Sequence, residues 1–161
     1  MKIVVTSDTH HNYHILKKIV ELNPDADLFI HLGDGENEFL DVRNETFGKQ
    51  FVFVKGNGDF GDWKESAVIG VNGYKIYCTH GDKLDVANSL DLLLYNAKKE
   101  KCKIALFGHT HIYMTDVVDG IYVMNPGSPE SPRNRLKPSY GVINIDTNGI
   151  IDMKIVEIKR D

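Results

Sequence analysis

Five short apolar runs in this chain each lead directly into polar side chains that can bind a metal ion. The segments that follow the runs are Asp8-Thr9-His10, Gly33-Asp34, Gly56-Asn57, His80-Gly81 and Gly108-His109-Thr110-His111. In open α/β sheets, ligands bind beyond the carboxyl ends of the strands. If the apolar runs are strands of such sheets, their ends meet, and we expect the five segments to form one crevice.

The spacing of apolar residues predicts alternating strands and helices in the first half of the chain. β-Branched and aromatic runs predict the strands, and an apolar stripe at helical spacing from Ile15 to Val20 predicts the first helix. The expected elements are strands at 2–6, 27–32 and 51–55, and helices at 12–22 and 36–44. This order favours a parallel sheet with helices on its faces.

Glycine-containing turns predict hairpins in the second half. Asn72-Gly73, Asp119-Gly120 and Asn148-Gly149 each stand between two β-like runs, where such dipeptides favour tight turns. The expected strands are 68–71, 74–79, 104–107, 114–118, 121–124, 140–146 and 150–158. Residues 84–101 are expected to form the longest helix, with Asp82 and Asp85 capping it rather than binding a third ion.

Together these elements predict an α/β fold. Two mixed sheets, the second mostly antiparallel, would form a β-sandwich flanked by helices. The length of 161 residues is enough for one domain with a sizeable core. We therefore expect residues 1–161 to form a single domain.

The composition narrows the classes of partner and compartment. The formal net charge of −4 argues against an extended nucleic-acid surface, which would be basic. Cys78 and Cys102 lack the spacing of a zinc motif or a disulfide framework, so we expect reduced thiols. No segment approaches the ~18 apolar residues of a membrane span, and the N-terminal run is too short for a signal peptide. We expect a cytoplasmic protein without a membrane partner.

The candidate ligands combine carboxylate, imidazole and amide groups without a thiolate. They are Asp8, His10, Asp34, Asn57, His80, His109 and His111. This mixture suits manganese, iron, cobalt, nickel or zinc better than magnesium or calcium alone. Seven ligands are too many for one catalytic ion with an open position, but they suit two bridged ions, and we expect Asp34 to be the bridge.

Two pairs of ligands, Asp8 with His10 and His109 with His111, have i, i+2 spacing. In extended backbone such residues point to the same side, so each pair is expected to reach one centre. Taken singly, each of these motifs is also ordinary turn chemistry. The five occurrences together, each after a predicted strand, favour the metal site.

The ordered motifs resemble those of the calcineurin-like metallophosphoesterases. The resemblance covers residues 8–111, and Asn125-Pro126-Gly127-Ser128 extends it towards a compact bacterial and archaeal subgroup of small phosphodiesterases. It implies a β-sandwich flanked by helices and two divalent ions, manganese first. It also implies that Asp8, His10 and His111 hold one ion and Asn57, His80 and His109 the other, with Asp34 between them.

The resemblance implies hydrolysis of a small phosphate ester or nucleotide-type substrate, most simply a phosphodiester. A hydroxide bridging the two ions would attack phosphorus directly, while Asn57 and His80 orient the phosphoryl group. Two alternatives stay open. One is a protein-binding scaffold of the same fold, and the other is a phosphomonoesterase or nucleotide pyrophosphatase. A homodimer or homotetramer is expected from the exposed sheet edges of small members.

The sequence departs from the wider family after Asn57, where many members carry a histidine that protonates the leaving oxygen. This chain has Gly58 there. His11 is a candidate substitute acid or phosphate contact, and Arg133 a candidate phosphate contact. Asp59 fits either a carboxylate behind a metal-bound imidazole or an exposed turn residue.

Two further histidines have structural interpretations. His31 is expected to be a hydrogen-bonded residue within a strand, and His14 a surface residue.

Overall fold

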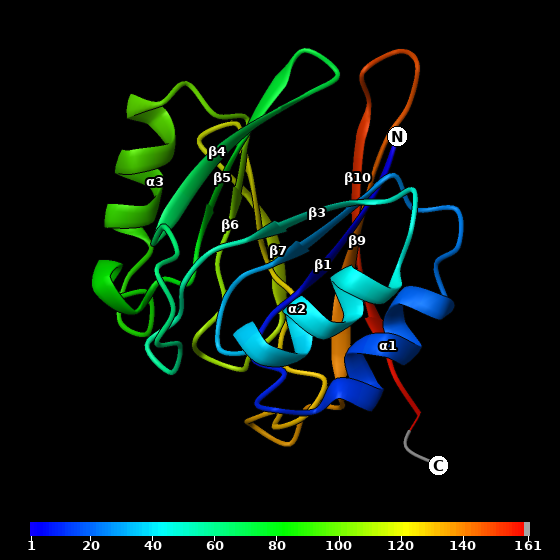
Figure 1. The fold of residues 1–161 in the computed structure, drawn as a ribbon. Helices are drawn as coiled ribbons and strands as arrows, with labels where there is room; N and C mark the ends of the chain where they lie inside the picture. The colour runs from blue at the N-terminus through cyan, green and yellow to red at the C-terminus, as the bar shows by residue number, and fades with distance from the viewer. Residues whose placement is uncertain (160–161) are drawn as a thin grey trace.

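A computed structural model describes residues 1–159, which form two five-stranded sheets packed face to face, with helices outside them (Figure 1). The first sheet has the order β10-β9-β1-β2-β3. Its strands are β1 (Lys2–Thr6), β2 (Leu28–His31), β3 (Gln50–Phe53), β9 (Ser139–Ile145) and β10 (Ile151–Glu157). β1, β2 and β3 are parallel, as the alternation of strands and helices predicts, and β9 and β10 are antiparallel to their neighbours.

The second sheet has the order β4-β5-β6-β8-β7. Its strands are β4 (Ser66–Val71), β5 (Tyr74–Thr79), β6 (Ile104–Leu106), β7 (Met114–Val118) and β8 (Ile121–Asn125). The three central strands are parallel, and the two edge strands are antiparallel to them. The expectation of a mostly antiparallel second sheet is therefore wrong, because the last hairpin joins the first sheet beside β1.

The turns of two predicted hairpins are confirmed by their backbone angles. Asn72 and Gly73 have φ of 45° and 81°, and Asp119 and Gly120 have φ of 52° and 76°. Two successive left-handed residues define the type I′ turn that suits the twist of paired strands. These short turns fix the register of β4 on β5 and of β7 on β8.

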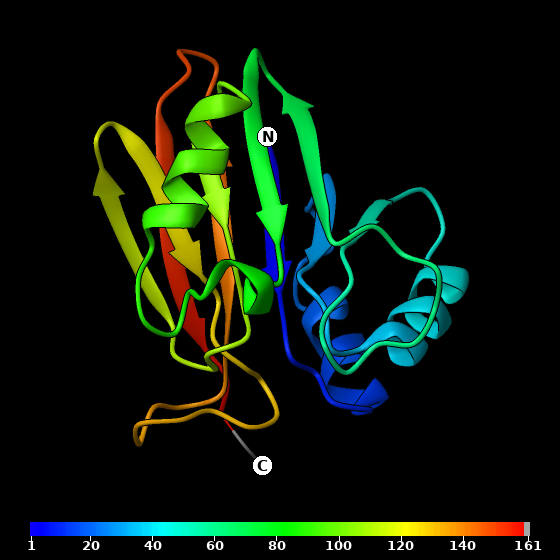
Figure 2. The same cartoon turned by 90° about the vertical axis from the view of Figure 1, so that its left-hand side faces the viewer.

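Three helices cover the outer faces of the sandwich. α1 (Tyr13–Glu21) and α2 (Glu36–Glu45) lie on the first sheet and α3 (Asp91–Lys99) on the second (Figure 2). α1 begins where the Asn12 carboxamide accepts the Ile15 backbone N–H at 3.0 Å. No helix within residues 1–159 has both the length and the apolar character needed to cross a bilayer.

The predicted helix at 84–101 is wrong in its first half. Asp82–Leu84 form a single 3-10 turn, and Asp85 adopts a left-handed φ of 52°. The Asp85 carbonyl then accepts the backbone N–H groups of Asn88 and Ser89, so the chain turns before α3 begins. Consequently Asp82 and Asp85 do not cap the long helix as expected.

The core has three apolar layers. The largest lies between the two sheets and contains Ile3, Val5, Ile30, Ile76, Leu106, Met124 and Ile143, among others. A second layer joins the first sheet to α1 and α2, and a third joins the second sheet to α3. Burial on both faces explains why the sequences of β1, β2 and β6 are nearly continuous apolar runs rather than alternating ones.

Candidate metal centre

The five predicted ligand segments meet at one end of the sandwich. Backbone hydrogen bonds join them: Asp8 N–H donates to the Gly33 carbonyl at 3.0 Å, and Gly108 N–H donates to the His80 carbonyl at 2.9 Å. His10 N–H also donates to the Asp34 carbonyl at 3.1 Å. The segments come from the carboxyl ends of β1, β2 and β3 in one sheet and β5 and β6 in the other. The expected crevice therefore lies across both sheets.

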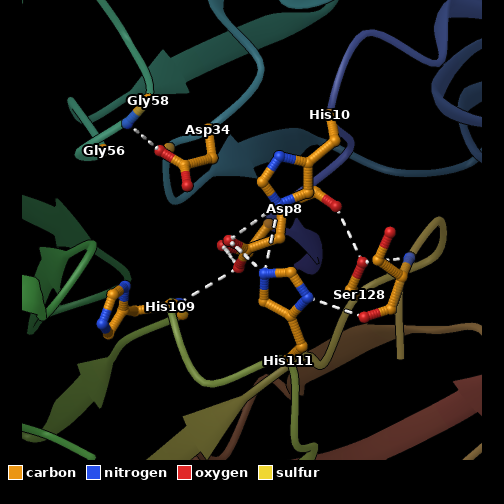
Figure 3. A network of polar contacts seen from close by, with 12 residues as sticks. Asp8, His10, Asp34, Gly56, Gly58, His109, His111 and Ser128 are labelled. Carbon is orange, nitrogen blue, oxygen red and sulfur yellow. Dashed lines mark hydrogen bonds and ion pairs between the residues drawn. The ribbon is translucent and has the colours of Figure 1, made fainter. Parts of the chain in front are cut away.

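Asp8, His10 and His111 form a first cluster around one carboxylate oxygen (Figure 3). Asp8 Oδ1 lies 3.1 Å from His111 Nε2 and 3.6 Å from His10 Nε2. The two imidazole nitrogens are themselves 3.1 Å apart. All three donor atoms are thus close enough to share one cation.

Asp34, Asn57, His80 and His109 form a second cluster beside the first. Asn57 Oδ1 lies 3.0 Å from His80 Nε2 and 3.1 Å from His109 Nδ1. Asp34 Oδ2 lies 3.5 Å from His80 Nε2. These are the residues that the family resemblance implies for a second ion, and the structure brings them together.

The ring of His111 directs an unprotonated nitrogen into the first cluster. Its Nδ1 faces the Ser131 carbonyl oxygen at 2.6 Å. A carbonyl only accepts, so Nδ1 carries the proton and, in the neutral ring, Nε2 is an acceptor. That acceptor faces a second acceptor, Asp8 Oδ1, at 3.1 Å. Only a cation between the two atoms, a metal ion or a proton, removes their repulsion.

His80 repeats this arrangement in the second cluster. Its Nδ1 faces the Leu32 carbonyl at 2.7 Å, which leaves Nε2 as an acceptor that lies 3.0 Å from Asn57 Oδ1 and 3.5 Å from Asp34 Oδ2. The side chain of His80 is fully buried. In metal sites, a hydrogen bond from the far ring nitrogen fixes the tautomer and the ring orientation. The donor set of both clusters therefore fits divalent cations.

Asp8 is a buried carboxylate that is only partly satisfied. Its Oδ2 accepts the Ser7 hydroxyl at 2.7 Å and the His109 backbone N–H at 3.1 Å, while its buried Oδ1 has no hydrogen-bond partner. Burial would raise the pKa of Asp8, but the neighbouring imidazoles of His10, His111 and His80 outweigh it and hold this pKa well below its usual range. The carboxylate is therefore charged and has one oxygen available for a cation.

The same electrostatics act on the histidines. The Asp8 carboxylate, whose Oδ1 lies 3.6 Å from His10 Nε2, is the main reason that the pKa of His10 is raised, although burial opposes it, and the charge of Asp34 adds to the rise. Burial and the neighbouring His80 lower the pKa of His109. Because metal ligands must be unprotonated, protons and metal ions compete for His10.

Left-handed backbone brings most of these side chains inward. Five of the seven candidate ligands have positive φ, namely Asp8 (56°), His10 (42°), Asp34 (58°), His109 (68°) and His111 (58°). For non-glycine residues this conformation costs on the order of 1 kcal/mol each and clusters at functional sites. The expectation of extended backbone at the two i, i+2 pairs is wrong. His109 and His111 consequently point into different clusters rather than one.

A comparison of the sequence with known protein families identifies the family of this chain. Residues 1–148 match the calcineurin-like phosphoesterase superfamily domain. The chain belongs to the calcineurin-like phosphoesterase superfamily. A probable metallophosphoesterase of Mycoplasma pneumoniae is 35% identical over 159 residues, which cover 94% of this chain and 94% of that relative. The phosphodiesterase MJ0936 of Methanocaldococcus jannaschii is 27% identical over 144 residues, covering 79% and 83%.

Solved structures of other proteins share the fold of this chain. A predicted phosphoesterase from Streptococcus pneumoniae TIGR4 superposes with a TM-score of 0.83 and 27% identity, covering 97% of this chain and 88% of that one. The zinc complex of Entamoeba histolytica Vps29 superposes with a TM-score of 0.75 and 22% identity, covering 98% and 99%. The likeness to Vps29 concerns the fold alone. Members of the superfamily use divalent metals, which agrees with the donor set described above.

Two carboxylates, those of Asp8 and Asp34, lie between the two clusters. Asp8 Oδ1 belongs to the first cluster and also lies 3.9 Å from His80 Nε2. Asp34 was predicted as the bridge, and it contacts His80 directly while its charge acts on His10. Asp8 and Asp34 therefore both stand between the two clusters.

Asp59 holds the backbone of the crevice in place. It is neither a partner of a metal-bound imidazole nor an exposed turn residue, the two roles expected from the sequence. Its carboxylate is buried and accepts four backbone N–H groups, from Asp34, Gly35, Glu36 and Gly56, at 2.8–3.1 Å. These four bonds involve no imidazole. The rings of His80 and His111 donate to backbone carbonyls instead of to Asp59. Asp59 thereby joins the turn after β2 to the turn after β3.

A buried polar chain behind the first cluster was missed by the sequence analysis. Glu38 Oε1 accepts the Thr9 hydroxyl at 2.5 Å and the His11 backbone N–H at 2.9 Å. The Thr9 hydroxyl also contacts His31 Nε2 at 2.9 Å, and His31 Nδ1 accepts Gly33 N–H at 3.1 Å. His31 is therefore the hydrogen-bonded strand residue that was predicted. In the sequence, Glu38 is one of several acids on a short helix, and nothing there shows that it is buried.

The Asn125–Ser128 motif holds the ends of β1 and β6 in place. The Ser128 hydroxyl donates to the Asp8 carbonyl at 2.8 Å, and Asn125 Nδ2 donates to the Gly108 carbonyl at 3.0 Å. The Ser128 hydroxyl also accepts Ser131 N–H at 2.8 Å, and Ser131 in turn receives the His111 ring proton. The motif thus acts on the ligands through the backbone.

The two candidate substrate contacts differ in position. His11 is exposed and lines a pocket beside Asp34. Arg133 has an exposed side chain, and its backbone N–H donates to the His111 carbonyl at 3.1 Å. His14 is exposed on α1, as expected. The structure therefore places His11 in the crevice, whereas Arg133 lies beside it through its backbone.

Proposed function

We propose that this chain is a dinuclear, metal-dependent phosphodiesterase that acts on small phosphate esters. The observation that carries the proposal is the set of acceptor atoms that face one another around the buried Asp8 Oδ1, with His111 Nε2 at 3.1 Å. Asp8, His10 and His111 would hold one ion, and Asn57, His80 and His109 the other, with Asp34 bridging. When bound, two divalent ions acidify water and stabilise charge on the phosphoryl oxygens.

Manganese is the first cofactor we propose. The donor set mixes imidazole, carboxylate and an amide oxygen, and it contains no thiolate. Such sets suit manganese, iron, cobalt, nickel and zinc, whereas all-oxygen sets suit magnesium and calcium. The rings of His80 and His111 are fixed by their carbonyl partners, which prepares the donor atoms before any ion arrives.

The charge of the adjoining pocket favours diesters over monoesters. The pocket is lined by His10, His11, Asp34, Gly35, Glu36, Asn37, Gly58, Asp59 and Phe60, which include no lysine or arginine. A phosphomonoester carries about 1.5 to 2 negative charges at neutral pH, whereas a diester carries about one. The carboxylates of Glu36 and Asp59 therefore disfavour the monoester more strongly. A relative that is named a phosphodiesterase supports the same choice.

The chain's own groups would orient the ester and supply a proton to the leaving oxygen. Asn57 Oδ1 and His80 Nε2 lie 3.0 Å apart in the second cluster, where the phosphoryl group would bind. Gly58 stands where many family members carry a histidine, and its N–H donates to Asp34 Oδ1 at 2.7 Å. His11 is the alternative acid that we propose, because it lines the same pocket and is not a candidate metal ligand.

The test is manganese-dependent hydrolysis of bis(p-nitrophenyl) phosphate. We expect activity to appear with two equivalents of manganese per chain and to be abolished in Asp34→Asn and His80→Ala. His14→Ala is the matched control, since His14 is an exposed histidine on α1 outside the crevice. Wild-type activity in either ligand variant would contradict the dinuclear centre.

The Vps29-like fold leaves a protein-binding scaffold as the alternative function. The seven candidate ligands lie in two adjoining clusters, which supports the enzyme over the scaffold. A chain that binds two manganese ions and hydrolyses no phosphate ester would favour the scaffold. A screen that includes phosphomonoesters and nucleotides tests the monoesterase and pyrophosphatase alternatives in the same plates.

We further propose that residues 1–161 act as one domain in the cytoplasm and assemble into a homodimer or homotetramer. The edge strands β10, β3, β4 and β7 support assembly, because an unpaired strand edge can pair with a second copy. Sedimentation of the purified chain tests the oligomeric state.

A further inference from the structure

Phe60 is a large apolar side chain exposed beside the proposed metal centre. It is 91% exposed, and it lines the same pocket as the ligands His10 and Asp34. The pocket measures about 100 Å³. Exposed single apolar residues are common on protein surfaces, so exposure alone carries no function. The position of this ring against a phosphate-binding centre is what requires an explanation.

The backbone under Phe60 is held rigidly. The carboxylate of Glu36 accepts the Phe60 N–H at 3.0 Å and the Gly61 N–H at 2.7 Å. One residue earlier, Asp59 is buried and its carboxylate accepts four backbone N–H groups. The loop therefore presents the ring from a fixed backbone instead of letting it fold back onto the core. Such preorganisation lowers the entropy cost of binding a ligand against the ring.

We propose that Phe60 is a stacking surface for a flat ring of the substrate, of which a nucleobase is the common biological form. This inference rests on the proposed function, because the metal centre would hold the phosphate while the ring stacks on Phe60. Aromatic faces bind every base through its π-face without requiring a particular sequence. Asn37 lines the same pocket and offers a donor and an acceptor to the edge of such a ring.

The size of the pocket limits how much stacking on Phe60 contributes to the binding affinity. A pocket of about 100 Å³ is smaller than the ~300 Å³ typical of sites that enclose a ligand. The base would therefore lie against the ring at the mouth of the pocket, with its outer face in water. We expect an effect at the low end of the range for stacked bases, about 5- to 10-fold in affinity.

The experiment compares two ligands that differ only by the base. Adenosine 5′-phosphate and ribose 5-phosphate are titrated calorimetrically into the manganese-loaded full chain, and phosphate release is monitored to exclude turnover. We expect wild type to prefer the adenosine ligand, Phe60→Ala to weaken it about 5- to 10-fold, and Phe60→Trp to retain it. The affinity for ribose 5-phosphate should not change.

Phe47 provides the matched control. It is 90% exposed and follows α2, and it does not line the pocket, so Phe47→Ala should leave both affinities unchanged. Equal binding of the two ligands by wild type, or an unchanged adenosine affinity in Phe60→Ala, would overturn the stacking proposal and leave the metal centre standing. Failure of both ligands to bind would likewise overturn the stacking proposal, whereas absence of manganese-dependent hydrolysis of bis(p-nitrophenyl) phosphate by wild type would overturn the proposed function.

Discussion

Gly56 lies so close to Asp34 that one added methyl group should disable the proposed centre. A Cβ at position 56 would stand 2.2 Å from Asp34 Oδ1 and 2.5 Å from the Asp34 backbone nitrogen. Ordinary contacts begin near 3.4 Å, so the carboxylate would have to move by about 1 Å or more. The backbone nitrogen cannot move independently, because the Asp59 carboxylate accepts its N–H at 2.8 Å.

The displacement predicts a kinetic defect of known order. A misplacement of about 1 Å in a catalytic arrangement costs on the order of 10²-fold in rate. We therefore expect Gly56→Ala to lower kcat/KM for bis(p-nitrophenyl) phosphate about 100-fold at saturating manganese. Overpacking should also destabilise the fold by about 1–3 kcal/mol, which thermal unfolding measures separately.

Two other glycines calibrate this result. A Cβ at Gly58 would stand 3.1 Å from Asp34 Oδ1, so a shift of a few tenths of an ångström suffices and Gly58→Ala should lose only a fewfold of activity. A Cβ at Gly70 on β4 meets nothing within 4 Å, and Gly70→Ala should behave as wild type. A folded Gly56→Ala protein with the activity of Gly70→Ala would refute the assignment of Asp34 to the centre.

Three further outcomes are expected. Burial lowers the pKa of His31 to about 4. Between pH 6.5 and pH 4, His31 is therefore protonated in the unfolded chain but neutral in the folded chain. The metal-free protein should lose about 3 kcal/mol of unfolding free energy as pH falls from 6.5 to 4, and urea melts of His31→Gln should lack most of that slope. Glu38→Ala removes the acceptor for Thr9 and for the His11 N–H, so manganese affinity should fall about 10- to 100-fold, whereas Glu38→Gln should restore most of it. Calorimetry that finds equal affinities in both Glu38 variants would count against this positioning role. Lowering the pH should release manganese before the protein unfolds, because the raised pKa of His10 favours its protonation; pH-independent manganese affinity would contradict this.

The strands and the convergence of ligands could be predicted from sequence because both depend on local patterns. Apolar runs such as Ile3 to Thr6 are buried on both faces and have a clear boundary at Asp8. The dipeptides Asn72-Gly73 and Asp119-Gly120 supply the two left-handed residues that their turns require. The meeting of five strand ends then follows from parallel pairing within each sheet.

Other features depend on contacts that sequence spacing does not encode. The pairing of β9 with β1 joins segments that are far apart in the sequence. It places the last hairpin in the first sheet, so the second sheet is less antiparallel than expected. The turn at Asp85 interrupts a helical apolar pattern that continues through Leu90 and Leu93. The left-handed backbone at His109 and His111 could not be read from the sequence, because histidine, like other non-glycine residues, adopts positive φ in only a minority of cases.

The proposed two-ion centre is tested most directly by anomalous diffraction from crystals of the protein soaked in manganese. We expect two anomalous peaks about 3.5–4 Å apart. One should lie among Asp8, His10 and His111, and the other among Asn57, His80 and His109. A single peak, or none among these residues at saturating manganese, would contradict the dinuclear centre.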